Sequence, residues 1–94
     1  MKLLCIDSEQ IYCDIIALCA EKEGVVVESA TNFNDAISVF KRFSPDIVTL
    51  DVLIKGGSGL ELVNELKNLS GKRFVPMIFV ASQTSDTVMD RCFK

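Results

Sequence analysis

Two aspartates in this sequence stand where they could take part in binding an ion. Asp7 directly follows the apolar run LLCI at residues 3–6, and Asp51 directly follows the run IVTL at residues 47–50. Short, continuously apolar runs are typical of strands that are buried on both faces of a parallel sheet. The carboxyl ends of such strands meet at one edge, where these folds bind their ligands. Two carboxylates there repel each other unless a cation joins them, and oxygen ligands of this kind suit Mg²⁺.

Each aspartate also has a purely structural interpretation. Asp is a common turn former, because its side chain accepts hydrogen bonds from the backbone that follows it. For Asp7 or Asp51 alone, that interpretation is the better one. Two acids that end separate strands of one sheet favour a divalent-cation site instead.

Apolar periodicity and turn residues predict four strands that alternate with four helices. Continuous apolar or β-branched runs indicate the strands, and apolar side chains three or four residues apart indicate the helices. Asn32 or Asn34 is the expected N-cap of the second helix, and Ser85 or Asp86 begins the fourth. The strands are predicted at residues 3–6, 25–29, 47–50 and 75–80, and the helices near residues 11–23, 33–43, 59–69 and 86–93.

The same spacing predicts which face of each helix is apolar. In the first helix Tyr12, Ile16 and Cys19 lie beside the main stripe. The predicted stripes are Ile11, Ile15 and Leu18 in the first helix, Phe33, Ala36, Ile37 and Phe40 in the second, and Leu60, Val63 and Leu66, with Leu69 at the edge, in the third.

Repeated strand–helix units with short connections predict an α/β fold. Doubly apolar strands joined by helices form a parallel sheet with helices on both faces, that is, a doubly wound sheet. After Asp51 the segment KGGSG at residues 55–59 is expected to be a loop. It lacks the G-x-x-x-x-G-K-[ST] arrangement of nucleotide-binding loops, and the chain has no histidine. An enzyme or a cofactor-binding protein is therefore disfavoured.

Composition and charge limit the domain organisation and the partners. The 94 residues are enough for one domain, and 49% hydrophobic with 24% charged residues is a globular composition. A formal net charge of −3 argues against binding to a phosphate backbone, so no nucleic-acid partner is expected. The apolar start is broken at Asp7 and is too short for a signal peptide or a membrane span. We therefore expect a cytoplasmic protein without membrane contact.

The four cysteines do not have the spacing of a metal or redox motif. None forms a C-x-x-C pair, and no histidine accompanies them. Cysteine often behaves as a small buried hydrophobe, which is the expectation for these four. They are Cys5, Cys13, Cys19 and Cys92.

Several segments together resemble the receiver domain of two-component response regulators. LLCIDSE at residues 3–9 is similar to the acidic start of that family, and SPDIVTLD at residues 44–51 is similar to its third strand, which ends on the phosphoacceptor. Gly59, eight residues after Asp51, matches the start of its third helix, and PMIFVAS at residues 76–82 resembles its fourth strand. The resemblance runs through the chain in register. It implies a flavodoxin-like sheet with strand order 2-1-3-4.

The resemblance implies a function and a site. Asp51 would accept a phosphoryl group from a sensor histidine kinase or a phosphotransfer protein, and would also be a ligand of Mg²⁺. Asp7 and the backbone carbonyl of Leu53 would be further metal ligands. Such a domain is a phosphoacceptor and at most assists its own phosphotransfer, so it is not an enzyme in the usual sense.

The sequence departs from the family pattern at three positions. Ser8 stands where the family has a second acid, so it would contribute to the metal site only through water, and we expect weak Mg²⁺ binding. The switch Ser or Thr is replaced by Ala81, and Ser82, one residue later, faces the other way along a strand. Lys55 replaces a proline and is expected to be a solvated loop residue.

The resemblance stops before the family's fifth strand and fifth helix. We therefore expect residues 1–94 to form a single, truncated receiver domain without the lysine of the fifth strand. The fourth strand would be an apolar sheet edge, and such edges pair readily with other chains. Self-association through this strand or the following helix is expected. The alternative function is a receiver-like interaction or dimerisation module that is weakly phosphorylated or not phosphorylated.

Overall fold

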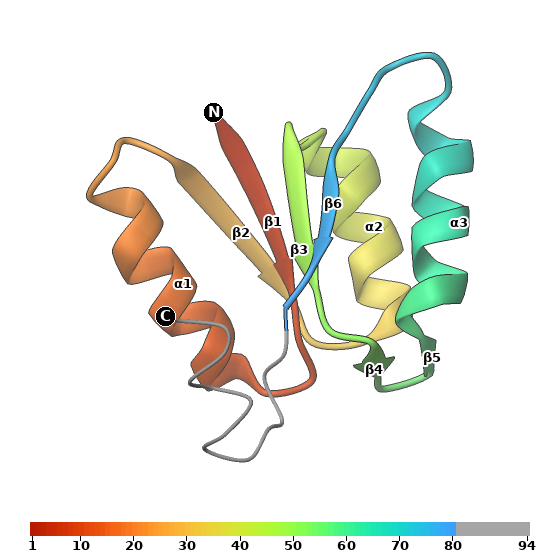
Figure 1. The fold of residues 1–94 in the computed structure, drawn as a ribbon, viewed down its shortest axis with the longest axis horizontal. Helices are drawn as coiled ribbons and strands as arrows, with labels where there is room; N and C mark the ends of the chain where they lie inside the picture. Colours follow the sequence, from red (N-terminus) through yellow and green to blue (C-terminus); the bar gives the residue numbers. More distant parts are fainter. Residues whose placement is uncertain (81–94) are drawn as a thin grey trace.

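A four-stranded parallel sheet carries the fold (Figure 1). The structure, a computed structural model, describes residues 1–80 of the 94-residue chain. The strand order is β2-β1-β3-β6, which confirms the predicted order and the flavodoxin-like class. The strands of this sheet are β1 (Lys2–Ile6), β2 (Val26–Ala30), β3 (Ile47–Leu50) and β6 (Met77–Phe79).

Three helices cover the two faces of this sheet. Because the connections between parallel strands are right-handed, α1 lies on one face while α2 and α3 lie on the other (Figure 1). None of the helices within residues 1–80 has the length and apolar character needed to span a bilayer. The helices are α1 (Gln10–Glu21), α2 (Phe33–Phe43) and α3 (Gly59–Ser70).

The main core lies between the sheet and the pair of helices α2 and α3. Alternate side chains of β1 and β3 and the inward faces of the two helices pack together there, with almost no exposed area. Sheet strands with both faces covered explain the continuous apolar runs of the sequence. The buried side chains of this core include Leu4, Ile6, Ala36, Phe40, Val48, Leu50, Leu62 and Leu66.

Local signals in the sequence account for both ends of α2. The Asn32 side chain accepts a hydrogen bond from the Asp35 N–H at 2.8 Å, so Asn32 is the N-cap, one of the two residues predicted. At the other end Ser44 has a left-handed backbone with a φ of 50°, and its N–H donates to the Phe40 carbonyl. Pro45 follows, and the helix ends at Phe43 as predicted.

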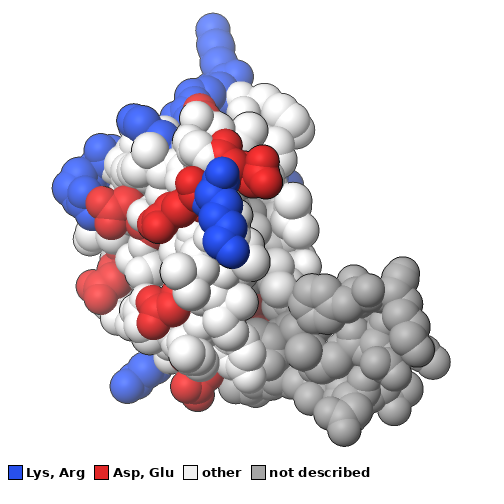
Figure 2. Space-filling model, turned by 90° about the vertical axis from the view of Figure 1, so that its left-hand side faces the viewer, with Lys and Arg blue, Asp and Glu red and all other residues white. Residues whose placement is uncertain are grey.

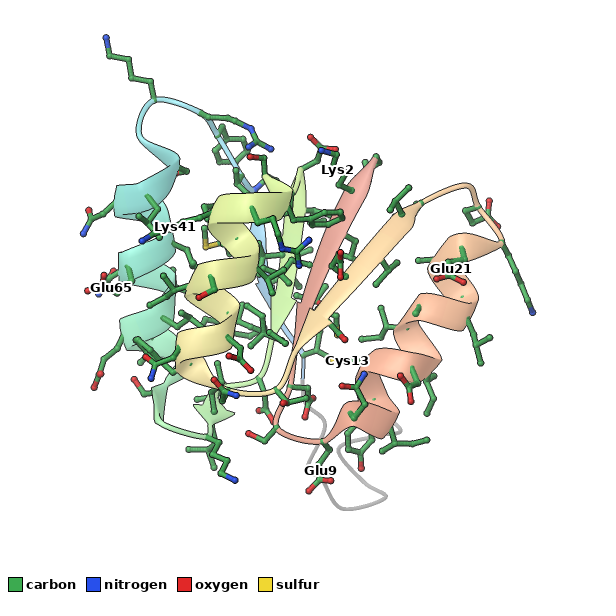
Figure 3. The ribbon with its side chains drawn as sticks, turned by 180° about the vertical axis from the view of Figure 1, so that it is seen from behind. Lys2, Glu9, Cys13, Glu21, Lys41 and Glu65 are labelled. Carbon is green, nitrogen blue, oxygen red and sulfur yellow. The ribbon has the colours of Figure 1, made fainter. Side chains whose placement is uncertain are left out.

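Two predicted helix faces were wrong. In α1 the stripe of Ile11, Ile15 and Leu18 is exposed, and Cys13 is the residue that is buried against the sheet (Figure 3). In α3 Leu60 is 63% exposed, whereas Leu62 is fully buried beside the correctly predicted Leu66.

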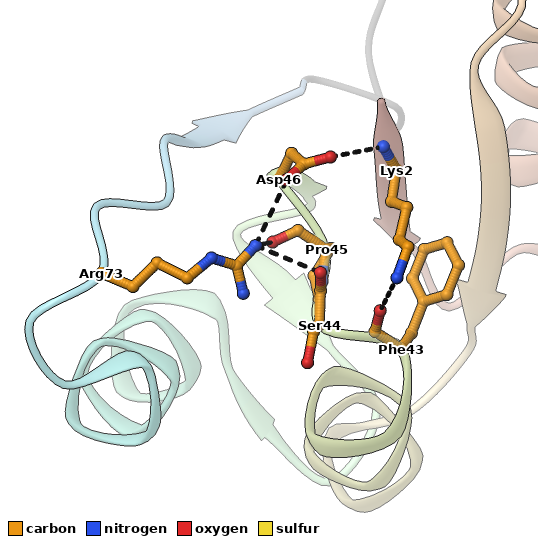
Figure 4. A network of polar contacts seen from close by, with 6 residues as sticks. All are labelled: Lys2, Phe43, Ser44, Pro45, Asp46 and Arg73. Carbon is orange, nitrogen blue, oxygen red and sulfur yellow. Dashed lines mark hydrogen bonds and ion pairs between the residues drawn. The ribbon is translucent and has the colours of Figure 1, made fainter.

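A polar network joins the start of β1, the start of β3 and the segment before β6 (Figure 4). It lies at the N-terminal ends of these strands, whereas Asp7 and Asp51 follow the C-terminal ends. The Asp46 carboxylate accepts from the Lys2 backbone N–H at 2.8 Å, and the Lys2 ammonium donates to the Phe43 carbonyl at 3.1 Å. The Arg73 guanidinium donates to the carbonyls of Ser44 and Pro45 and lies 3.4 Å from Asp46. This network ties the segment before β6 to the start of β3.

Several predicted boundaries differ from the structure by one or two residues. β2 runs one residue later than expected, and β6 is shorter than residues 75–80. A short antiparallel hairpin follows Asp51, with β4 (Leu53–Ile54) before the predicted loop of residues 55–59 and β5 (Gly57–Ser58) inside it. The predicted fourth helix, together with Ala81, Ser82 and Cys92, lies outside the described residues.

Candidate functional site

Asp7 and Asp51 end two neighbouring strands at the same edge of the sheet. β1 and β3 pair in parallel with Ile6 opposite Leu50, and the Asp51 N–H donates to the Ile6 carbonyl at 3.1 Å. The two aspartates are therefore the next residues of adjacent strands. Both are buried, with 4% and 7% of their surface exposed. Buried carboxylates are costly unless they are hydrogen-bonded or paired with a cation, so this edge is chemically unusual within the described chain.

Each carboxylate also makes a turn hydrogen bond. The Glu9 N–H donates to Asp7 Oδ1 at 2.9 Å, and the Leu53 N–H donates to Asp51 Oδ1 at 3.4 Å. Both aspartates therefore act as turn formers, as their structural interpretation predicts. A carboxylate offers about four lone-pair sites, so a turn bond does not use up its capacity to bind a cation.

The hairpin β4–β5 follows Asp51 and brings the backbone of Leu53 to the same edge. Leu53 pairs with Ser58 and Ile54 pairs with Gly57. The Ile54 side chain is buried in the main core, and the Leu53 side chain is 66% exposed. Because the leucine side chain has no polar atom, Leu53 can act as a ligand beside Asp51 only through its backbone.

Ser8 contacts this hairpin through its hydroxyl group. Its Oγ accepts a hydrogen bond from the Lys55 backbone N–H at 2.9 Å. From the sequence, Ser8 is expected to reach a metal ion only through water, and Lys55 is expected to be a solvated loop residue. No local pattern indicates their hydrogen bond, because the two residues are 47 positions apart.

Glu9 does not replace the missing second acid. It is exposed, precedes α1, and points away from the sheet (Figure 3). Within residues 1–80 no three His, Cys, Asp or Glu side chains form a metal-binding cluster. Two carboxylates and one backbone carbonyl fit Mg²⁺, because this ion binds through one or two carboxylates and keeps several waters.

Cys5 and Cys13 form a buried thiol pair just below this edge, between β1 and α1. Cys13 Sγ lies 3.4 Å from the Cys5 carbonyl oxygen, and both side chains are about 1% exposed. The hydrogen bond between the two thiols lowers the pKa of Cys5 and, together with burial, raises the pKa of Cys13. The sequence-based expectation of buried cysteines is confirmed for this pair, whereas Cys19 is exposed.

The surface beside α1 carries charges of both signs. On the face that Figure 2 shows, acidic and basic side chains are interspersed, and no continuous basic area forms there. This face does not provide the single-sign field that steers polyanions.

Comparison with known proteins shows which family this sequence matches. The family model of the response regulator receiver domain matches residues 3–94. Among solved structures, the non-phosphorylated HemR receiver domain from Leptospira biflexa is 20% identical, with a TM-score of 0.75 over 98% of this chain and 73% of that chain. The chemotaxis response regulator CheY4 of Vibrio cholerae is 21% identical, with a TM-score of 0.80 over 95% of this chain and 74% of that chain.

A third solved structure is described in an activated form. The BeF3-activated N-terminal receiver domain of Klebsiella pneumoniae RstA is 25% identical, with a TM-score of 0.75 over 94% of this chain and 73% of that chain. Because the identities are low, these solved structures support the assignment of the fold. The family model matches the sequence itself and supports the assignment of the family.

Proposed function

The chain belongs to the response regulator receiver domain family, and we propose that Asp51 is its phosphoacceptor. Receiver domains are the phosphoacceptor signalling modules of two-component systems. The observation that carries the assignment to Asp51 is the pairing of β1 with β3, which sets this buried carboxylate beside Asp7 at the ligand-binding edge of the sheet.

The proposed reaction is a transfer of a phosphoryl group to a carboxylate. A carboxylate oxygen of Asp51 forms a bond to phosphorus while the P–N bond of a phosphohistidine breaks, and the electron pair of that bond stays on the imidazole nitrogen. The donor is a sensor histidine kinase or a phosphotransfer protein. The transferred group spreads negative charge over its oxygens, so positioning and electrostatic stabilisation supply most of the catalysis.

Asp7, Asp51 and the Leu53 carbonyl are the proposed ligands of Mg²⁺. When bound, the ion would neutralise charge on the carboxylates and on the phosphoryl oxygens. Burial supports this set, because two nearly inaccessible carboxylates on adjacent strands gain from a shared cation. Ser8 adds no negative charge, so we expect Mg²⁺ affinity to be weak.

Residues 1–94 are proposed to act as one receiver domain, and self-association stays a prediction. β6 lies at the edge of the described sheet, and Ile78 and Phe79 there are 48% and 40% exposed. An exposed apolar edge strand favours pairing with a second copy. Light scattering at micromolar concentration tests this, and a stable monomer would reject it.

Labelling by a small phosphodonor tests the proposed function. Incubation of the chain with acetyl phosphate and Mg²⁺ should add one phosphoryl group, detected as a mass increase that does not form when the metal is chelated beforehand. Asp51→Asn should abolish the labelling. Asp14→Asn is the matched control, because Asp14 is an exposed carboxylate on α1 and should be dispensable.

Two outcomes would contradict the proposal in different ways. Labelling that persists in Asp51→Asn would show that another residue is the acceptor. A folded wild-type chain that is never labelled would favour the alternative, a receiver-like interaction module without phosphotransfer.

A further inference from the structure

We propose that Ser8 is a positioning residue of the phosphoacceptor site, because its hydroxyl group holds the hairpin that carries the Leu53 carbonyl. This inference rests on the proposed function of Asp51. Its basis is the hydrogen bond from the Lys55 N–H to Ser8 Oγ, 2.9 Å long, which joins the turn after β1 to the hairpin after β3. Both segments follow a strand that ends on one of the two aspartates.

Lys55 is held through both of its backbone polar groups. Its N–H donates to Ser8, and its carbonyl accepts from the Phe33 N–H at 2.9 Å at the start of α2. Gly57, on the second strand of the hairpin, lies so close to the Phe33 ring that a Cβ atom there would overlap it. The tip of the hairpin is thus fixed between α2 on one side and Ser8 on the other.

Apart from these contacts at its tip, the hairpin is held at its base. Each of its strands is two residues long, and such short hairpins are not stable alone in water. At its base, the Gly59 N–H donates to the Val52 carbonyl at 2.7 Å, and Ile54 is buried in the core. Leu53 lies between this base and the tip, so its carbonyl direction depends on whether the tip stays in place.

Ser8 therefore contributes through geometry and not through charge. Its hydroxyl oxygen already accepts from the Lys55 N–H, and a neutral hydroxyl is a poorer Mg²⁺ ligand than a carboxylate. Ser8 brings no negative charge to the site, and its hydroxyl oxygen tethers the loop that supplies the proposed backbone ligand.

Amide hydrogen exchange in the metal-free chain tests the tether directly. Ser8→Ala should increase the exchange rate of the Lys55 amide about fivefold, the effect of one neutral hydrogen bond on a local opening equilibrium. Ser8→Thr keeps the hydroxyl and should restore protection. Ser70→Ala is the matched control, since the Ser70 hydroxyl donates to the Lys67 carbonyl in α3 and lies far along the chain from Ser8.

This readout is independent of the proposed function. It needs neither metal nor phosphodonor, so a failure of Asp51 as acceptor would leave it unaffected. An unchanged Lys55 exchange rate in a folded Ser8→Ala protein would overturn the inference.

The Mg²⁺ dependence of labelling then separates positioning from a general loss of structure. Ser8→Ala should raise the Mg²⁺ concentration that gives half of the maximal acetyl phosphate labelling rate severalfold. The rate at saturating Mg²⁺ should stay within about twofold of wild type, because Asp51 and Asp7 are unchanged. Ser8→Thr should restore the wild-type value. If Ser8→Ala increased Lys55 exchange and yet left the Mg²⁺ concentration for half-maximal labelling unchanged, Ser8 would hold the hairpin but would not position the site.

Discussion

The backbone of Gly59 lies against the carbonyl oxygen of Asp51. A Cβ atom at residue 59 would overlap this oxygen, and it would also come within about 3.0 Å of the Val52 Cα and of the Phe79 ring. Because two of these three neighbours are backbone atoms, they have little freedom to move aside. The first residue of α3 and the end of β3 are thus fitted to each other at a place where only glycine is accommodated.

Gly59→Ala is therefore expected to destabilise the chain. Overpacking against backbone costs about 1–3 kcal/mol, and the strain falls on the segment that positions Asp51. Urea unfolding measures the change in the free energy of unfolding, and acetyl phosphate labelling should slow at the same time. Leu60→Ala, at the next and largely exposed residue, should change stability by less than about 0.5 kcal/mol. Equal effects of the two substitutions would contradict this account.

Asp7→Asn should weaken Mg²⁺ binding without disturbing the turn. The asparagine oxygen can still accept the Glu9 N–H that now bonds Asp7 Oδ1. The substitution removes one of two carboxylates, and even outer-shell partners of a metal are worth about 10- to 100-fold in affinity. We expect the Mg²⁺ concentration for half-maximal labelling to rise at least about tenfold, measured in parallel with the Asp14→Asn control. An unchanged requirement would show that Asp7 has only its turn-forming role.

Sequence patterns sufficed for the sheet because its signal is local and redundant. Runs such as residues 3–6 and 47–50 are apolar throughout, since both faces of each strand are covered, and each run ends on an acid at the same sheet edge. The position of Asp7 beside Asp51 follows from that pattern once the strands are parallel. Their roles in binding and phosphotransfer remain predictions.

The helix faces could not be predicted equally well. In α3 the predicted face reaches Leu66 from Leu60 by two steps of three residues, whereas Leu62 lies four residues before Leu66, and only Leu62 is buried with it. The face that α3 buries depends on its tertiary packing, which includes the close approach of Gly59 to Asp51 and which helical periodicity does not encode. The hairpin after Asp51 was not predicted for a similar reason. The hydrogen-bond partners of the Lys55 backbone are Ser8 and Phe33, which lie far away in the sequence.

The Asp46 carboxylate should give the chain a stability that depends on acid pH. The Lys2 N–H, first, and then the nearby charge of Arg73 lower the pKa of Asp46 below its ordinary value of 3.8. The folded state therefore holds its proton less tightly than the unfolded chain does. This stabilising contribution is complete above pH 3.8 and is lost as the pH falls through the lower pKa of the folded state.

Asp46→Asn tests this pH dependence. The loss of unfolding free energy relative to wild type should be larger at pH 6 than at pH 2.5, measured by urea unfolding at both values. The difference should largely persist in 1 M salt, because its main cause is a short hydrogen bond and not a long-range charge. A loss that is the same at both pH values would contradict the assigned cause.

The thiols of Cys13 and Cys19 should differ strongly in reactivity. The thiolate is the nucleophile in alkylation, and both burial and the hydrogen bond to Cys5 raise the pKa of Cys13, whereas Cys19 is exposed on α1. Under native conditions iodoacetamide should modify Cys19 first, with Cys13 slower by about 100-fold or more, because its reaction requires opening of the α1–β1 contact. Peptide mass spectrometry follows each site. In 6 M guanidinium the two should react at similar rates, and rapid native modification of Cys13 would show that α1 does not cover it as described.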